Sequence, residues 1–159
     1  MKETNTAILG FGNPVRKDDA IGCYVLEKLY DKLNKEEHIS LFDMGTSAFE
    51  VLFKLKDHQR IIIVDAVINS GEEDGTVFKL PASEINASIQ DDPMVFLHSL
   101  KWDQALSYAK KIMGDEFPEN DISVYLIAVT DTSLNEGISD PVLEAGEKVI
   151  DLIFEESKS

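Results

Sequence analysis

Cysteine, positive charge and long apolar segments are all scarce in this chain of 159 residues. Cys23 is the only cysteine, which excludes an internal disulfide and a cysteine cluster that binds zinc or an iron–sulfur centre. No apolar stretch reaches the ~18 residues that a membrane-spanning helix needs, and residues 1–6 lead into the first apolar run without signal-peptide character. We therefore expect a protein of the reducing cytoplasm.

The 15 Lys and Arg residues are outnumbered by 30 Asp and Glu residues, which gives a formal net charge of −15. A field of this sign repels nucleic acid and anionic membrane surfaces, so neither is an expected partner. A basic peptide, a cation or a metal ion suits the charge better. The length and the ordinary composition, without repeats or low-complexity segments, predict one domain over residues 1–159, and we expect it to be a monomer.

Residues 6–22 are the stretch around which the chain is organised. A short apolar run predicts a buried strand, and a tight turn at Gly10 and Gly12 follows it. Asp18 and Asp19 then stand where the next helix begins. The turn therefore holds carboxylates at the carboxyl end of a strand, which is where open α/β sheets bind their ligands.

Strand patterns alternate with helix patterns along the rest of the chain. Further strands are expected at 39–43, 60–66, 76–80 and 122–128, and helices at 20–33, 48–55, 99–113 and 141–153. The inward stripe of the last helix is expected to consist of Val142, Ala145, Val149, Leu152 and Ile153. Residues 82–97 lack a regular pattern and predict a surface loop. The β-branched run at 60–66 indicates a central strand that is buried on both faces. The pattern predicts a three-layer α/β sandwich, with a mainly parallel twisted sheet of about five strands and helices on both faces.

Right-handed crossovers favour a strand order that starts 2-1-3, which would bring Asp19 and Asp65 together. Asp43 would flank them from the second strand, and His98 would reach over them from the irregular loop. Two carboxylates and an imidazole suit a divalent transition metal, without choosing among nickel, zinc, iron and manganese. Each residue also has a simpler interpretation: Asp19 as a first-turn acid that interacts with the helix dipole, Asp65 as a turn cap, and His98 as an ordinary loop residue.

Two other kinds of site fit the sequence poorly. A dinucleotide site would use the glycines after the first strand, but Pro14 removes an N–H group from that turn and Val15 stands where a third glycine belongs. The two acids that follow would also repel a pyrophosphate at the helix start. A serine hydrolase is disfavoured because the chain has no Gly-x-Ser-x-Gly motif. Cys23 is expected to be a small, partly buried core residue, since nothing near it in sequence marks a base.

Four sequence motifs together resemble those of the hydrogenase maturation proteases, which trim the C-terminus of the large subunit of nickel–iron hydrogenases. They are Gly10-Phe-Gly-Asn13 with Asp18-Asp-Ala-Ile-Gly22, Asp43-Met-Gly-Thr46, Ile61-Ile-Ile-Val-Asp-Ala66, and His98 after an irregular loop. The resemblance covers nearly the whole chain. It places the family's metal-binding trio on Asp19, Asp65 and His98, and its other notable acid on Asp43. Asp19 is an aspartate where several relatives have glutamate, and Met44 stands where a second glycine is frequent.

The resemblance implies an endopeptidase that acts once on each precursor, after nickel has been inserted. The trio would grip the nickel of the precursor, for which zinc or cadmium are possible surrogates. Catalysis would use Asp19, Asp43 and Asp65, either with a metal-polarised carbonyl or water, or with a carboxylate as general base, and families of this kind are classed as aspartic-type. The alternative is a non-catalytic chaperone that binds nickel or the precursor on the same fold.

Overall fold

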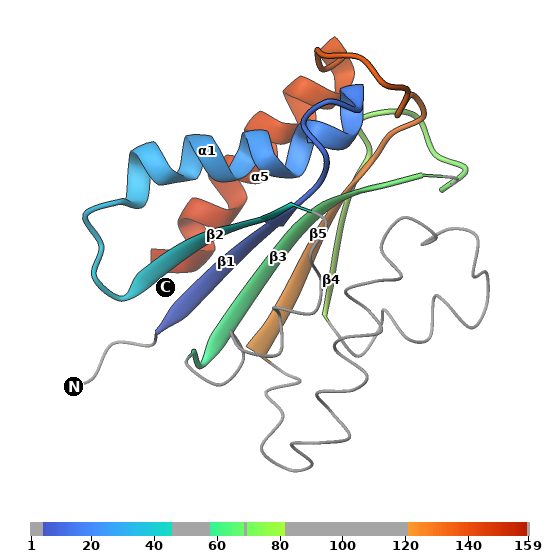
Figure 1. Ribbon diagram of the computed structural model, residues 1–159. Coiled ribbons are helices and arrows are strands. Elements are labelled where there is room, and N and C mark those ends of the chain that lie inside the picture. The colour runs from blue at the N-terminus through green and yellow to red at the C-terminus, as the bar shows by residue number, and fades with distance from the viewer. Residues whose placement is uncertain (1–4, 46–57, 69, 82–120, 159) are drawn as a thin grey trace, which may run out of the picture.

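The computed structural model describes residues 5–45, 58–68, 70–81 and 121–158. Its centre is a five-stranded sheet in the order β2-β1-β3-β5-β4, in which only β4 runs antiparallel to its neighbour (Figure 1). The strands are β1 (Thr6–Phe11), β2 (Ile39–Gly45), β3 (Arg60–Val67), β4 (Val77–Pro81) and β5 (Ile122–Ala128). The helices are the short 3₁₀ helix η1 (Lys17–Ala20), α1 (Ile21–Leu33) and α5 (Asp140–Lys158).

The structure confirms the five predicted strands and the order 2-1-3 at the start of the sheet. β1 is the middle strand of that trio and pairs in parallel with both β2 and β3. The helix predicted over 20–33 is also present, and η1 adds a turn before it. The segments predicted at 48–55, 82–97 and 99–113 lie outside the described residues.

Helices α1 and α5 lie side by side on one face of the sheet (Figure 1). Each helix directs one apolar stripe towards the strands, as its periodicity predicts. The stripe of α1 consists of Ile21, Val25, Leu26, Leu29 and Leu33, all buried. On α5 the sequence predicts Leu152 in the inner stripe, and this is wrong, because Leu152 is 48% exposed. Ile150 is buried in its place, since it shares the inward side of the helix with Val149 and Ile153.

β3 is the strand predicted to be buried on both faces, and residues 61–67 are all buried. Val64 and Ala66 belong to the core beneath α1 and α5, whereas Ile61 and Ile63 alternate with them and are equally inaccessible to solvent.

None of the described helices is long and apolar enough to cross a membrane.

The start of α1 packs directly on the backbone of the strands. A Cβ atom on Gly22 would lie 2.1 Å from the carbonyl oxygen of Phe11 and 3.1 Å from that of Val64. On the other side of this contact, Gly12 has a φ of +150°, and a Cβ atom there would lie 2.2 Å from the carbonyl oxygen of Asp19. Glycine is required at both positions because a side chain would push η1 and α1 away from the strand ends.

We predict that Gly22→Ala lowers the free energy of unfolding by roughly 3 kcal/mol, because the new methyl group meets backbone atoms that cannot move aside. Gly146→Ala is the matched control: it is also a buried helical glycine, but its Cβ atom would meet the Cδ1 atom of Ile21 at 2.6 Å, which is the end of a flexible side chain. Since alanine favours the helix, Gly146→Ala should stay within about 1 kcal/mol of the parent. Urea unfolding measures both, and similar losses in the two variants would contradict the prediction.

Candidate active site

Asp19 and Asp65 are buried carboxylates at the carboxyl edge of the sheet, each 2% exposed. Asp19 ends the turn that follows β1, and its Oδ2 atom accepts a hydrogen bond of 2.9 Å from the backbone N–H of Asn13. Asp65 lies near the end of β3, where its Oδ1 atom accepts a hydrogen bond of 2.8 Å from the N–H of Ala66. Asp65 comes directly after Val64, which pairs with Gly10 near the end of β1. The turn that carries Asp19 also begins near Gly10, so both acids come after the same paired position of β1 and β3.

Asp65 points away from α1 and α5. Side chains alternate along a strand, and its neighbours Val64 and Ala66 both face those helices. The carboxylate of Asp65 is therefore directed to the opposite face of the sheet.

Asp43 lies at the same edge, on β2, and is exposed. It pairs with Gly10, while Gly45 pairs with Phe11, so Met44 forms a bulge between two consecutive pairs. The Asp43 Oδ1 atom accepts hydrogen bonds from the backbone N–H of Gly45 at 3.1 Å and from the Cys23 thiol at 3.6 Å. The bulge thus holds Asp43 against the first part of α1.

The thiol of Cys23 lies within the electrostatic field of all three acids. Its pKa is raised to about 12, first by burial, then by the charge and hydrogen bond of Asp43, and then by the charges of Asp19 and Asp65. All three carboxylates therefore act on one sulfur atom. The residue is partly buried, as predicted, but its contact with Asp43 depends on the packing of α1 against β2, which leaves no pattern in the sequence. A raised pKa disfavours the thiolate, which is the form of cysteine that acts as a nucleophile.

The predicted trio is brought together in part. Asp19 and Asp65 lie at one edge, with Asp43 nearby, whereas His98 lies outside the described residues. Within the described ranges, no three His, Cys, Asp or Glu side chains are close enough to hold a metal ion. A metal site at this edge therefore stays a prediction that requires His98.

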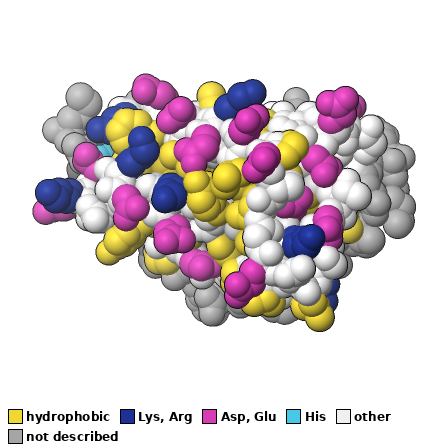
Figure 2. Space-filling view, turned by 90° about the horizontal axis from the view of Figure 1, so that it is seen from above, with side chains coloured by type: hydrophobic (Ala, Val, Ile, Leu, Met, Phe, Trp, Pro, Cys, Tyr) yellow, Lys and Arg dark blue, Asp and Glu magenta, His cyan; other side chains and the backbone are white. Residues whose placement is uncertain are grey.

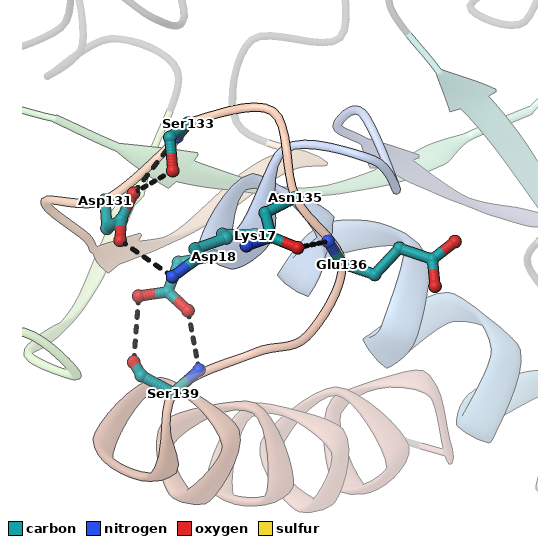
Figure 3. Close-up of polar contacts among 7 residues, drawn as sticks. All are labelled: Lys17, Asp18, Asp131, Ser133, Asn135, Glu136 and Ser139. Atoms are coloured by element: carbon teal, nitrogen blue, oxygen red, sulfur yellow. Dashed lines mark hydrogen bonds and ion pairs between the residues drawn. The ribbon is translucent and has the colours of Figure 1, made fainter.

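Asp18, next to Asp19 in sequence, has a different partner. Its side chain is 2% exposed and accepts two hydrogen bonds from Ser139, one from the backbone N–H at 2.7 Å and one from the hydroxyl at 2.8 Å (Figure 3). Ser139 immediately precedes α5, so Asp18 ties η1 to the start of the last helix. The sequence predicts both acids at a helix start but does not separate their roles, because Ser139 is 121 residues away.

The loop before α5 holds η1 through further contacts (Figure 3). The backbone N–H of Lys17 donates to the carbonyl of Asn135 at 2.8 Å, and the Lys17 ammonium lies 3.2 Å from a carboxylate oxygen of Asp131. The pKa of Asp131 is lowered to about 2, first by hydrogen bonds from the Ser133 hydroxyl and backbone N–H, and also by Lys17. Lys17 has a φ of +44°, a left-handed conformation that these contacts maintain. The turn that carries Asp19 is therefore held both by the loop before α5 and by the ends of the strands.

Known proteins resemble this chain in sequence and in structure. A family model described as hydrogenase maturation protease matches residues 23–156. A Methanocaldococcus jannaschii protein assigned provisionally to this group is 30% identical over an alignment of 167 positions, which covers 99% of each chain. The hydrogenase 2 maturation protease of Escherichia coli is 30% identical over 139 residues, which are 87% of this chain and 80% of the relative. The structure superposes on the [NiFe] hydrogenase maturation protease HybD from Thermococcus kodakarensis with a TM-score of 0.81 and 20% identity, covering 96% and 99% of the two chains.

The five-stranded, mostly parallel sheet and the superposition on the Thermococcus kodakarensis structure identify a three-layer α/β fold, as predicted from the sequence, and the described helices α1 and α5 form one of its outer layers. The chain belongs to the hydrogenase maturation protease family, whose members are peptidases. The resemblance found in the motifs is therefore confirmed, and the edge that carries Asp19, Asp43 and Asp65 is the candidate active site.

We predict that Cys23 reacts with iodoacetamide at pH 8.5 roughly 100-fold more slowly in the folded protein than in guanidinium chloride, because the raised pKa leaves little thiolate. Asp43→Asn removes the charge nearest the sulfur, so it should lower the thiol pKa and speed the reaction of the folded protein. Glu144→Gln, an exposed change on α5, is the control. Labelling is followed by mass, and an unchanged rate in Asp43→Asn would contradict the contact between the two residues.

Proposed function

We propose that this chain is an endopeptidase that removes the C-terminal extension of a nickel–iron hydrogenase large-subunit precursor after nickel insertion. Family membership and the names of the relatives support the reaction and the substrate class. The observation that supports the proposal is the position of the acids at the carboxyl edge of the sheet, where Asp19 and Asp65 are buried and Asp43 accepts a hydrogen bond from the Cys23 thiol. A monomeric cytoplasmic enzyme fits this role.

Asp19, Asp65 and His98 would contact the nickel ion that the precursor carries. Two carboxylates and an imidazole are a donor set for borderline divalent metals, so zinc or cadmium would be surrogates. The burial of Asp19 and Asp65 supports this assignment, because a bound cation would stabilise ionised carboxylates that are withdrawn from solvent. Nickel would then anchor the precursor and admit only metal-loaded substrate.

Asp43 is the acid best placed to act as general base, because it is exposed whereas the other two are buried. It would take a proton from a water molecule as the water oxygen attacks the scissile carbonyl carbon. The proton would then pass to the leaving amine as the C–N bond breaks. This use of a carboxylate corresponds to an aspartic-type peptidase, with polarisation of the carbonyl by nickel as the alternative source of activation.

A non-catalytic chaperone is the competing function, since binding of nickel or the precursor alone would use the same trio. The two functions differ in one observable product. A peptidase shortens the large subunit, and a chaperone leaves its mass unchanged.

We predict that the purified protein shortens nickel-loaded large-subunit precursor from the same organism and leaves nickel-free precursor intact. Asp65→Asn and His98→Ala should each reduce processing by about 100-fold or more, because each removes a metal-binding group. The mass of the large subunit gives the readout. Asp151→Asn, an exposed change on α5, is the control and should process normally.

Thermal melting of the same variants separates loss of function from loss of fold. Asp65→Asn should melt at or above the parent temperature, since it relieves repulsion among carboxylates. Processing of nickel-free precursor at the same rate would remove nickel from the proposal. An unshortened nickel-loaded precursor would favour the chaperone.

We predict that nickel and zinc bind the isolated protein more tightly at pH 7.5 than at pH 5.5, by roughly tenfold. Metal binding needs a neutral imidazole, and histidine gains its proton at about pH 6.5 in model peptides, so affinity falls as the pH drops. Magnesium should bind poorly, because it prefers a shell made only of oxygen ligands. Calorimetric titration at the two pH values is the measurement, and equal affinity for all three metals at both values would exclude a metal site.

A further inference from the structure

A groove of about 610 Å³ lies between α1, β2 and the turn after β1. Its volume is within the range of about 300–1,000 Å³ that is typical of ligand sites. Leu26 and Leu41 form an apolar part of its lining, and Tyr30 stands on its rim, 57% exposed. Cys23 and Asp43 line it too, so the groove borders the candidate active site at Asp43.

The acidic side of the groove comes from α1. Glu27 and Asp31 both line it and stand four residues apart, so they are neighbours on one face of the helix, and like charges at this spacing repel each other. Asp43 adds a third carboxylate from β2. Among the described residues, none of these three acids forms an ion pair.

The lysines of α1 lie on another side of the helix. The Lys28 ammonium is 5.6 Å from the ring centroid of Tyr24, and the Lys32 ammonium is 5.4 Å from that of Phe154 on α5. Helix α1 is therefore divided by charge, with its lysines towards α5 and its acids towards the groove. Figure 2 shows that acidic side chains are spread across the face over α1 and α5, with hydrophobic side chains between them.

We propose that this groove binds the precursor segment next to the scissile bond, through one Lys or Arg side chain between Glu27 and Asp31 and an apolar side chain against Leu26 and Leu41. The proposal rests on the proposed peptidase function. Asp43 lines the groove, so a peptide whose scissile bond lies beside Asp43 would extend from there into the groove. The mixture of leucines and acids, which form no ion pair within the described part of the chain, complements a basic and apolar segment, whereas a hydrated cation would gain nothing from the leucines.

The first test neutralises the acids of the groove without changing their shape, in the double variant Glu27→Gln with Asp31→Asn. For nickel-loaded precursor, KM should rise roughly 3- to 10-fold while kcat stays unchanged, because two exposed charge contacts to bound substrate are lost. The matched control is Glu144→Gln with Asp151→Asn, which removes the same two charges from exposed positions of α5 and should leave KM unchanged. Circular dichroism checks that both variants are folded.

Ionic strength gives a second readout of the same variants. The difference in KM between parent and groove variant should shrink as NaCl increases from 50 to 500 mM, since salt screens exposed charges. Equal KM values for the parent and groove variant at low salt would overturn the proposal. An equal rise in the control double variant would assign the effect to net charge alone and would also overturn it.

The second test locates the peptide without using cleavage. A photo-crosslinking benzoylphenylalanine replaces Tyr30 on the groove rim or Leu152 on α5, both of which are exposed. With nickel-loaded precursor, the Tyr30 position should crosslink to a segment near the cleavage site that contains Lys or Arg, and the Leu152 position should not. Crosslinks from Tyr30 to any other region, to a second copy of this chain, or to no protein would refute the groove as the peptide site.

The two tests separate failure of this proposal from failure of the proposed function. Crosslinking at Tyr30 without any shortening of the precursor would refute the peptidase function and keep the groove as a precursor site. Normal shortening with unchanged KM in the groove variant would refute the groove and keep the peptidase.

Discussion

The close approach of η1 and α1 to the ends of β1 and β3 is the constraint on which the site depends. It exists because Gly22 allows the helix to contact the carbonyl oxygens of Phe11 and Val64, and because Gly12 allows the turn to contact the carbonyl of Asp19. A short turn pressed against the strand ends has little freedom, so the carboxylate of Asp19 is fixed beside the level of β3 from which Asp65 projects. Backbone packing at Gly12 and Gly22 therefore sets the position of the turn that carries Asp19.

The turn is also held by the two hydrogen bonds between Asp18 and Ser139. They give Asp18 a different role from its neighbour Asp19. Asp18 is a buried carboxylate with two hydrogen bonds, and a hydrogen bond to a charged group contributes about 1.5–3 kcal/mol. Those bonds couple the start of α5 to the turn that carries Asp19. The start of the last helix is therefore tied to this turn through Asp18, although the two segments are far apart in sequence.

Much of the fold could be predicted because its causes are local. The β-branched run at 60–66 marks the central strand, the stripe of α1 has helical spacing, and the right-handed crossover rule gives the order of the first three strands. Together these place Asp19 and Asp65 at one edge. The partner of Asp18, the contact of Cys23 with Asp43 and the exposure of Leu152 depend on packing between distant segments, which no local pattern encodes. The role of His98 is a prediction from its place after the irregular loop and from the motif resemblance.

The acids of the site differ in burial, and this difference bears on how a substrate would enter. Asp19 and Asp65 are withdrawn from solvent, and in the proposed function they would hold the cation that the substrate brings. Asp43 stands in solvent at the junction with the groove along α1, where Glu27 and Asp31 continue the negative charge outwards. A basic segment would meet exposed acids first and buried acids last, so the same sign of charge would serve to attract the chain and then to hold its metal. A substrate would meet the acids in this order because the strand ends lie deeper than the surface of α1. The order would be lost if Glu27 and Asp31 faced α5 instead.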